Sequence, residues 1–236
     1  MSDIEIIPTN TCPSTFAELS EQSNAYATYA SWMQLDVGDG VFVPAISWPY
    51  GEGQWEDFEH MATKGEHLPC ADTMSYEAHL MVEDPLHVGE LLARVGCRRI
   101  IAHIETCADV SAAREACSIW KAAGAAEVGF ALLLDTPLSV LDPIITLCDV
   151  VQIMSIATLG AQGAPYDARA LERVAILHAR YPYTVIAVDG GVSAVNIADL
   201  ARAGSRHFGV GSAIAKADNP LATYHDLGER AASAVI

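Results

Sequence analysis

Short apolar runs alternate with amphipathic stretches along nearly the whole chain. The runs have the length of strands, and several are apolar at every position, which is typical of parallel strands covered on both faces. We predict eight strands, at residues 4–7, 32–37, 76–82, 98–105, 127–134, 150–156, 184–189 and 207–211.

The stretches between these runs have the three-to-four-residue periodicity of amphipathic helices, for example at residues 85–96, 111–124, 170–181 and 193–204. Several carry helix-boundary residues. Ser193 is a candidate N-cap, and Gly96, Gly124 and Gly204 stand where C-terminal glycines belong.

Eight strand–helix units in 236 residues predict an α/β fold, a (β/α)8 TIM barrel, with residues 1–236 as a single domain. An open doubly wound sheet is the alternative. The irregular residues 48–75 are predicted to form a loop–helix–loop excursion over the second and third strands.

Composition narrows the class of protein. A hydrophobic content of 51% supports one large core, and a net charge of −17 argues against nucleic acid or an anionic membrane as partner. The six cysteines form no CxxC pair, which indicates reduced thiols. There is no apolar stretch of about 18 residues and no signal-peptide pattern. We therefore expect a soluble, cytoplasmic protein.

Polar residues recur near the ends of the predicted strands. In a barrel, alternate side chains point inward, and sites form at the carboxyl ends of the strands. Inward candidates there are Gln34 and Asp36, His79 and Met81, His103 and Glu105, Met154, and Asp189. Each alone could be a cap, a buried hydrogen-bonded residue or a packing residue. Their convergence would bury carboxylates that need compensation, and Asp, His and Asp are a ligand set for zinc or another divalent ion.

Two glycine-rich turns suggest a phosphate site. "VDGGV" (188–192) and "GVGSAI" (209–214) follow the seventh and eighth predicted strands, and we expect each to open a short helix. Enzymes with (β/α)8 barrels commonly bind phosphate at this place, on backbone amides. The candidate residues are Gly190, Gly191, Gly211 and Ser212. The alternative is that both segments are only tight turns.

The motifs and their order resemble the ribulose-phosphate 3-epimerases. The segments that carry the resemblance are "LDVGDGVFVP" (35–44), "HLMVEDP" (79–85), "HIET" (103–106), "VDGGV" and "GVGSAI". Their order and spacing agree with that family from Ile6 to about Pro220. The chain is identified as a divergent member.

The resemblance implies an isomerase, a ketose-phosphate 3-epimerase-like enzyme of pentose phosphate metabolism that inverts the carbon next to the keto group. It implies that Asp36 and Asp189 are acid/base carboxylates on opposite faces of the substrate, with an enediolate between the two proton transfers. A divalent metal ion, zinc first or else iron, manganese or cobalt, would stabilise that enediolate and be bound by Asp36, His79 and Asp189. Met81 and Met154 would line the reacting carbon.

The sequence also departs from the family's pattern. Gln34 stands where the family has a histidine ligand, and an amide oxygen is the poorer zinc ligand, so we expect weaker, lost or altered metal binding. Thr9 or Asn10 stands in place of a substrate-contacting serine. The altered sixth-strand loop, "MSIATLGAQGAP", contains Gly160 and Gly163, and Gly163 is a further candidate for the substrate pocket.

Two other functions stay open. One is a different sugar-phosphate isomerase on the same barrel, and the other is a catalytically inactive sugar-phosphate-binding protein. The related decarboxylase and hexulose-phosphate synthase branch would require a DxKxxD motif, and "DVGD" contains no lysine. We expect a phosphorylated ketose as the small-molecule partner and a homo-oligomer, with residues 48–75 as the contact or lid.

Overall fold

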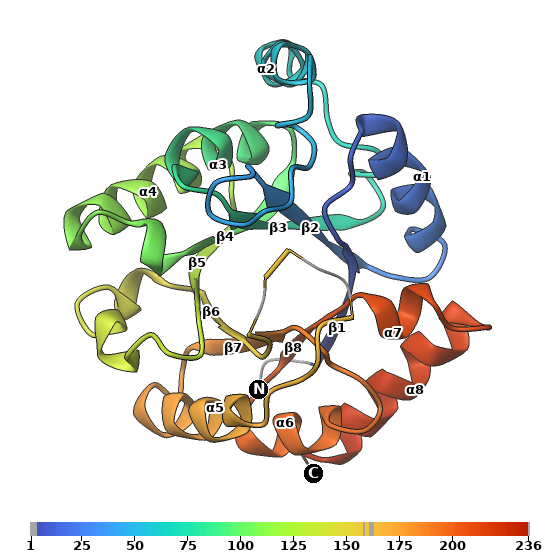
Figure 1. Cartoon of the computed structure of the whole chain (residues 1–236), viewed down its shortest axis with the longest axis vertical. Coiled ribbons are helices and arrows are strands. Elements are labelled where there is room, and N and C mark those ends of the chain that lie inside the picture. The colour runs from blue at the N-terminus through green and yellow to red at the C-terminus, as the bar shows by residue number, and fades with distance from the viewer. Residues whose placement is uncertain (1–3, 158, 161–162, 236) are drawn as a thin grey trace.

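Eight parallel strands close into a barrel in chain order, with β1 paired to β8 (Figure 1). The computed structural model describes residues 4–157, 159–160 and 163–235. The predicted α/β barrel is confirmed, and the open doubly wound alternative is wrong. The strands are β1 Glu5–Asn10, β2 Trp32–Gly38, β3 Ser75–Met81, β4 Cys97–His103, β5 Glu127–Leu132, β6 Val150–Met154, β7 Val185–Asp189 and β8 His207–Val210.

Helices form a ring around the strands (Figure 1). They are α1 Phe16–Tyr26, α2 Trp55–Lys64, α3 Pro85–Arg94, α4 Val110–Ala123, α5 Arg169–Arg180, α6 Ile197–Ala203, α7 Ser212–Ala215 and α8 Pro220–Ser233. Short 3-10 helices are η1 Ile104–Thr106, η2 Leu138–Leu141 and η3 Ile145–Leu147. None of these described helices combines the length and the apolar character that crossing a bilayer requires.

Several predicted boundaries shift. The fourth strand ends at His103, so Glu105 lies in η1 and does not share a strand face with His103. Ser193 is not the N-cap of α6, because that helix begins four residues later and its N-cap is Asn196. The carbonyl of Ser193 instead accepts the amide of Ile197 at 3.1 Å, in the turn before the helix.

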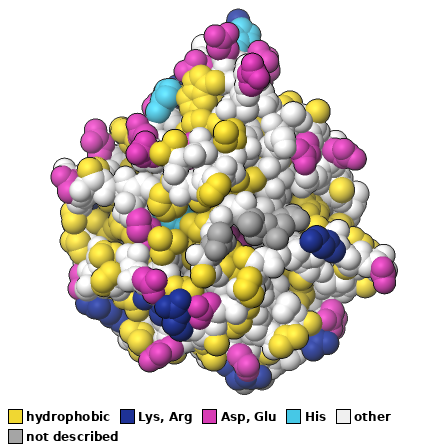
Figure 2. Space-filling model, viewed as in Figure 1, with side chains coloured by type: hydrophobic (Ala, Val, Ile, Leu, Met, Phe, Trp, Pro, Cys, Tyr) yellow, Lys and Arg dark blue, Asp and Glu magenta, His cyan; other side chains and the backbone are white. Residues whose placement is uncertain are grey.

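The segment between β2 and β3 contains α2, which lies outside the ring of helices (Figure 1). Phe58 anchors it, with ring centroids 4.9 Å from Trp48 and 5.7 Å from Trp55. Its first turn carries Glu56 and Asp57, and Figure 2 shows acidic side chains gathered on this projection. The outward face of α2 is thus charged.

Side chains that point into the barrel form successive levels, as Arg99, Ile101 and His103 do along β4. At the amino end, Arg99 is 1% exposed and pairs with Glu77 at 2.7 Å and Glu127 at 2.6 Å. Its guanidinium lies 4.1 Å from the ring centroid of Trp32. Further along the interior, a cluster of buried apolar side chains comprises Ile101, Ala131, Val150, Met154 and Ala187. The barrel is therefore filled below the level where the candidate site lies.

Candidate active site

A cavity opens at the carboxyl ends of the strands, with a volume of about 530 Å³ that includes its opening to solvent. Ten of the twelve predicted site residues line it: Thr9, Asp36, Met81, Met154, Gly163, Asp189, Gly190, Gly191, Gly211 and Ser212. The other two, Gln34 and His79, do not line the cavity and are fully buried at its floor. The structure thus brings together residues from β1, β2, β3, β6, β7 and β8.

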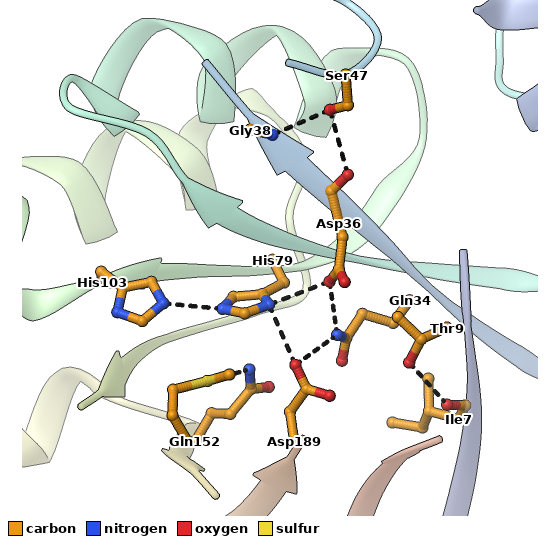
Figure 3. Close-up of polar contacts among 11 residues, drawn as sticks. Ile7, Thr9, Gln34, Asp36, Gly38, Ser47, His79, His103, Gln152 and Asp189 are labelled. Carbon is orange, nitrogen blue, oxygen red and sulfur yellow. Dashed lines mark hydrogen bonds and ion pairs between the residues drawn. The ribbon is translucent and has the colours of Figure 1, made fainter. Parts of the chain in front are cut away.

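Asp36 and Asp189 meet on one imidazole (Figure 3). Asp36 near the end of β2 is in register with His79 on β3, and Asp189 ends β7. His79 Nδ1 lies 3.1 Å from Asp36 Oδ1 and 3.4 Å from Asp189 Oδ2. Two carboxylates from strands that are not neighbours therefore share one buried partner.

Gln34 bridges the same two carboxylates from below. Its Nε2 donates to Asp36 Oδ1 at 2.8 Å and to Asp189 Oδ2 at 3.1 Å (Figure 3). Its Oε1 is buried and has no hydrogen-bond partner. The amide thus offers two N–H donors to the carboxylates and keeps an oxygen unused.

Burial and the two negative charges set the protonation of this group. Burial raises the pKa of Asp36 above its ordinary value, and the charge of Asp189 adds to this, although the hydrogen bond from His79 opposes it. Burial alone would lower the pKa of His79, but Asp189 and Asp36 outweigh it and raise that pKa to about 10. His79 is therefore a cation between the carboxylates in the metal-free chain.

The donor atoms fit a divalent cation. One ligand atom from each of Asp36, His79 and Asp189 lies within 4.8 Å of the others. Carboxylate oxygens and an imidazole nitrogen together suit zinc and similar ions. The unpaired Oε1 of Gln34 is a fourth buried donor atom at the same place. The site residues present thus match the cation that the sequence predicts.

His103 and Glu105 extend the group sideways. His103 Nε2 lies 3.0 Å from His79 Nε2, and His103 Nδ1 lies 3.2 Å from Glu105 Oε2. Burial lowers the pKa of His103 to about 4, so its imidazole is neutral. Burial alone would raise the pKa of Glu105. Hydrogen bonds from His103 and Thr136 outweigh it and hold that pKa below its ordinary value. The sequence indicates both residues as inward candidates and assigns neither a role.

The segment after β2 is shaped by Asp39. Its Oδ1 accepts the amides of Val41 at 2.8 Å and Phe42 at 3.0 Å, and its Oδ2 accepts the amide of Glu83 at 2.7 Å. The turn directs the Phe42 ring onto His103, with centroids 4.8 Å apart. A Cβ at Gly38 would lie 2.5 Å from the carbonyl oxygen of Ala45, so this strand end has no room for a side chain.

The two glycine turns border the cavity, but they differ from the prediction. Gly190 and Gly191 have φ of 106° and 64°, values that favour glycine. The next helix, α6, begins only at residue 197, so this turn does not open a helix. Gly211, by contrast, is directly followed by α7.

The segment after β6 forms part of the cavity wall. Met154, Ile156, Leu159 and Gly160 line it, and a Cβ at Gly160 would lie 3.2 Å from that of Val43. Thr158, Ala161 and Gln162 of the predicted loop lie outside the described residues. Among the described lining residues none is a lysine or an arginine.

Thr11 and Gly209 are among the further lining residues that the sequence did not indicate. Alternation along β8 places Gly209 inward, two positions before Gly211, and this signal could have identified it. A Cβ there would lie 2.8 Å from Asp189 Oδ1 and 3.0 Å from Gln34 Oε1. Thr11 follows β1 in an irregular segment, where no periodicity indicates its direction.

Comparison with known sequences gives consistent matches. The profile of the Ribulose-phosphate 3 epimerase family matches residues 7–215. The chain is 31% identical over 189 residues to ribulose-phosphate 3-epimerase of Aquifex aeolicus, which covers 78% of each chain. It is 30% identical over 210 residues to the enzyme's cytoplasmic isoform in Oryza sativa subsp. japonica, with 88% of this chain and 86% of that protein covered.

Solved structures with the same fold include enzymes of other names. The 3-hexulose-6-phosphate synthase of Salmonella typhimurium has a TM-score of 0.70 at 16% identity, covering 98% of this chain and 100% of that one. The 3-keto-L-gulonate-6-phosphate decarboxylase of Vibrio cholerae has a TM-score of 0.69 at 13% identity, covering 99% of each. At these identities the similarity shows the barrel fold alone.

Proposed function

Since this chain belongs to the ribulose-phosphate 3-epimerase family, as its motifs predicted, we propose that it is a ketose-phosphate 3-epimerase. Its substrate would be a phosphorylated ketose, and the carbon next to the keto group would be inverted. The observation that carries the proposal is the meeting of Asp36 and Asp189 at the floor of one cavity.

Inversion at a carbon bearing hydrogen needs a base on one face and an acid on the other. Asp36 on β2 and Asp189 on β7 reach the same nitrogen of His79 from strands that are not neighbours, and a sugar bound between them would have one carboxyl group on each face. One would take the C3 proton while the other delivers a proton to the opposite face. Burial and the negative charge of Asp189 raise the pKa of Asp36, which favours the protonated form that the acid in this exchange requires.

We propose that Asp36, His79 and Asp189 bind a divalent cation, with zinc as the first choice and iron, manganese or cobalt as alternatives. Its chemistry would be to supply positive charge to the substrate oxygens as the C3 proton leaves. Gln34 would contribute its unpaired Oε1, which requires its amide to turn away from one or both carboxylates. The chain's own part is to hold these donors in place and to exclude water.

The rest of the cavity suits a sugar phosphate. Met81 and Met154 give the reacting carbon an apolar wall. Gly191, Gly211 and Ser212 at the far side would bind the phosphate through backbone amides, without lysine or arginine. The cytoplasmic location and the homo-oligomer remain predictions.

A second function, binding of a sugar phosphate without catalysis, is favoured by one observation. The Gln34 amide already donates to both carboxylates, a role that a metal ligand could not keep while its oxygen binds a cation. In a binding protein this arrangement would be permanent. In an enzyme it would give way when the cation binds.

Exchange of the C3 proton separates the two functions. The chain is incubated in deuterium oxide with a panel of ketose phosphates, with and without zinc, manganese or iron(II), and deuterium at C3 is followed by NMR. An epimerase incorporates deuterium and forms the epimer, and Asp36→Asn or Asp189→Asn lowers the rate by about 10²–10⁴-fold. Asp57→Asn, an exposed carboxylate on α2, is the matched control and should leave the rate unchanged.

Binding of a ketose phosphate with no exchange under any of these conditions would favour the binding protein. Near-normal exchange by Asp36→Asn or Asp189→Asn would show that the two carboxyl groups are not the acid and base.

A further inference from the structure

A buried line of hydrogen bonds runs from the candidate cation site to η1, the short helix after β4. It starts at His79 on β3, continues through His103 on β4, and ends at Glu105 in η1 (Figure 3 shows the two histidines). His79 and His103 are fully buried. The proposed proton transfers use none of the atoms beyond His79, so this line needs its own explanation.

Glu105 is fixed at the far end of the line. Its Oε1 accepts the backbone amide of Leu133 at 2.8 Å and the hydroxyl of Thr136. Its Oε2 faces His103 Nδ1 at 3.2 Å. An ionised carboxylate has no proton to give, so it can only accept at each of these contacts.

The acceptor at one end sets the direction of the bond from His103, and the next bond follows for a His103 ring that carries a single N–H proton. Because Glu105 accepts, His103 carries its proton on Nδ1 and donates it. A neutral imidazole then has a lone pair on the other nitrogen, so His103 Nε2 accepts from His79 Nε2 at 3.0 Å. His79 Nε2 therefore keeps its proton, and the nitrogen free to lose one is Nδ1, which faces Asp36 and Asp189.

We propose that His103 and Glu105 are positioning residues for cation binding: they hold His79 as the Nε2–H form, so that its Nδ1 lone pair is the one offered to a divalent cation between Asp36 and Asp189. As the cation binds, the proton on Nδ1 leaves to solvent and the proton on Nε2 stays. Metal-binding histidines commonly donate their other N–H to such a partner, which fixes the ring and its tautomer. The inference rests on the proposed function only in requiring a cation at this site.

Glu105→Gln should reverse the donor and acceptor roles in this line of hydrogen bonds. The amide of Leu133 can only donate, so the oxygen of the new side chain would stay on Leu133 and its NH₂ would face His103. His103 Nδ1 would then accept, and its proton would move to Nε2. That proton would point at His79 Nε2, leaving the His79 proton on Nδ1, where the cation should bind.

The test measures affinity for Zn²⁺ alone and the tautomers of the two histidines. Competition with a chromophoric chelator gives the Zn²⁺ dissociation constant, and long-range ¹H–¹⁵N spectra of ¹⁵N-histidine-labelled chain give the proton positions. For the wild type we expect His103 protonated on Nδ1 and, with Zn²⁺, His79 protonated on Nε2. We expect Glu105→Gln to weaken Zn²⁺ binding by about 10–100-fold and to show His103 protonated on Nε2.

Glu127→Gln is the matched control, because the Glu127 carboxylate is also held by a hydrogen bond but pairs with Arg99 at the opposite end of the barrel. Its Zn²⁺ affinity should equal that of the wild type. If Glu105→Gln does not fold, Thr136→Val, which removes one donor to Glu105 but keeps the carboxylate, should retain the wild-type tautomers with a smaller loss of affinity.

The proposal is overturned if Glu105→Gln binds Zn²⁺ as tightly as the wild type, or if wild-type His103 carries its proton on Nε2. It is also overturned if the wild type binds no Zn²⁺. Failure of the proposed function has a different signature, namely the absence of C3 exchange with intact Zn²⁺ binding and wild-type tautomers.

Discussion

The side-chain amide of Gln34 on β2 donates a hydrogen bond of 3.1 Å to the carboxylate of Asp189 on β7, across the floor of the barrel. The two residues are 155 positions apart in the sequence, and their strands are not neighbours. The same amide also donates to Asp36. A neutral side chain thus does part of what a bound cation would do, namely separate two carboxylates.

This arrangement predicts that Gln34→His increases affinity for Zn²⁺. The substitution removes the amide donors that compete for the carboxylates and adds an imidazole nitrogen, the better zinc ligand. We expect the dissociation constant, measured by chelator competition, to fall at least about tenfold, equivalent to about 1.4 kcal/mol. Gln22→His on α1 is the control for an added surface imidazole. Equal affinity of Gln34→His and wild type would show that residue 34 does not contact the cation.

Gly209→Ala is predicted to impair catalysis through the position of one carboxylate. The new methyl group would lie 2.8 Å from Asp189 Oδ1 and 3.0 Å from Gln34 Oε1, so both side chains must move. A displacement of about 1 Å at an acid/base group costs on the order of 10²-fold in rate. The C3 exchange rate tests this, and Gly228→Ala in α8, where the nearest atom is 3.7 Å away, should keep the wild-type rate. An unimpaired Gly209→Ala enzyme would mean that Asp189 tolerates displacement.

Arg99→Met is predicted to destabilise the fold without affecting cation binding. It would leave the buried Glu77 without its 2.7 Å partner, and breaking a buried pair costs about 3–5 kcal/mol. The free energy of unfolding, measured in urea, should fall accordingly, and Zn²⁺ affinity should not change. Arg94→Met removes an exposed helical pair with Glu90, worth about 0.3–0.5 kcal/mol, and is the control. Similar losses from both variants would contradict a structural role for the buried pair.

The loss of folding stability at low pH is predicted to depend on His207. Burial, and then the charge of Arg99, lower the pKa of His207 to about 3, below its ordinary value of 6.5. Between about pH 3 and pH 6.5 the folded state therefore binds fewer protons than the unfolded state. The stabilisation is complete above pH 6.5 and is lost as the pH falls toward 3. Urea titrations from pH 7 to pH 4 should show a shallower loss of stability for His207→Gln than for the wild type. Parallel curves would mean that His207 titrates normally.

The barrel could be predicted from the sequence because its evidence is local. Eight apolar runs separated by amphipathic stretches leave few arrangements that bury both faces of every strand, and a closed parallel barrel is the one that fits this length. The inward direction of Asp36 and His79 follows from alternation along their own strands. The motifs likewise identify the family from the sequence alone.

The partners of the site residues were decided only by the tertiary structure. Sequence placed Gln34 at a ligand position, but only the closed barrel brings Asp189 within reach of its amide. The sequence assigned Glu105 to a strand. In the structure it lies in the 3-10 helix η1, where it accepts the amide of Leu133 and contacts His103. Periodicity along one strand determines which way a side chain points. Which side chains meet depends on the stagger and closure of all eight strands, and no local pattern contains that information.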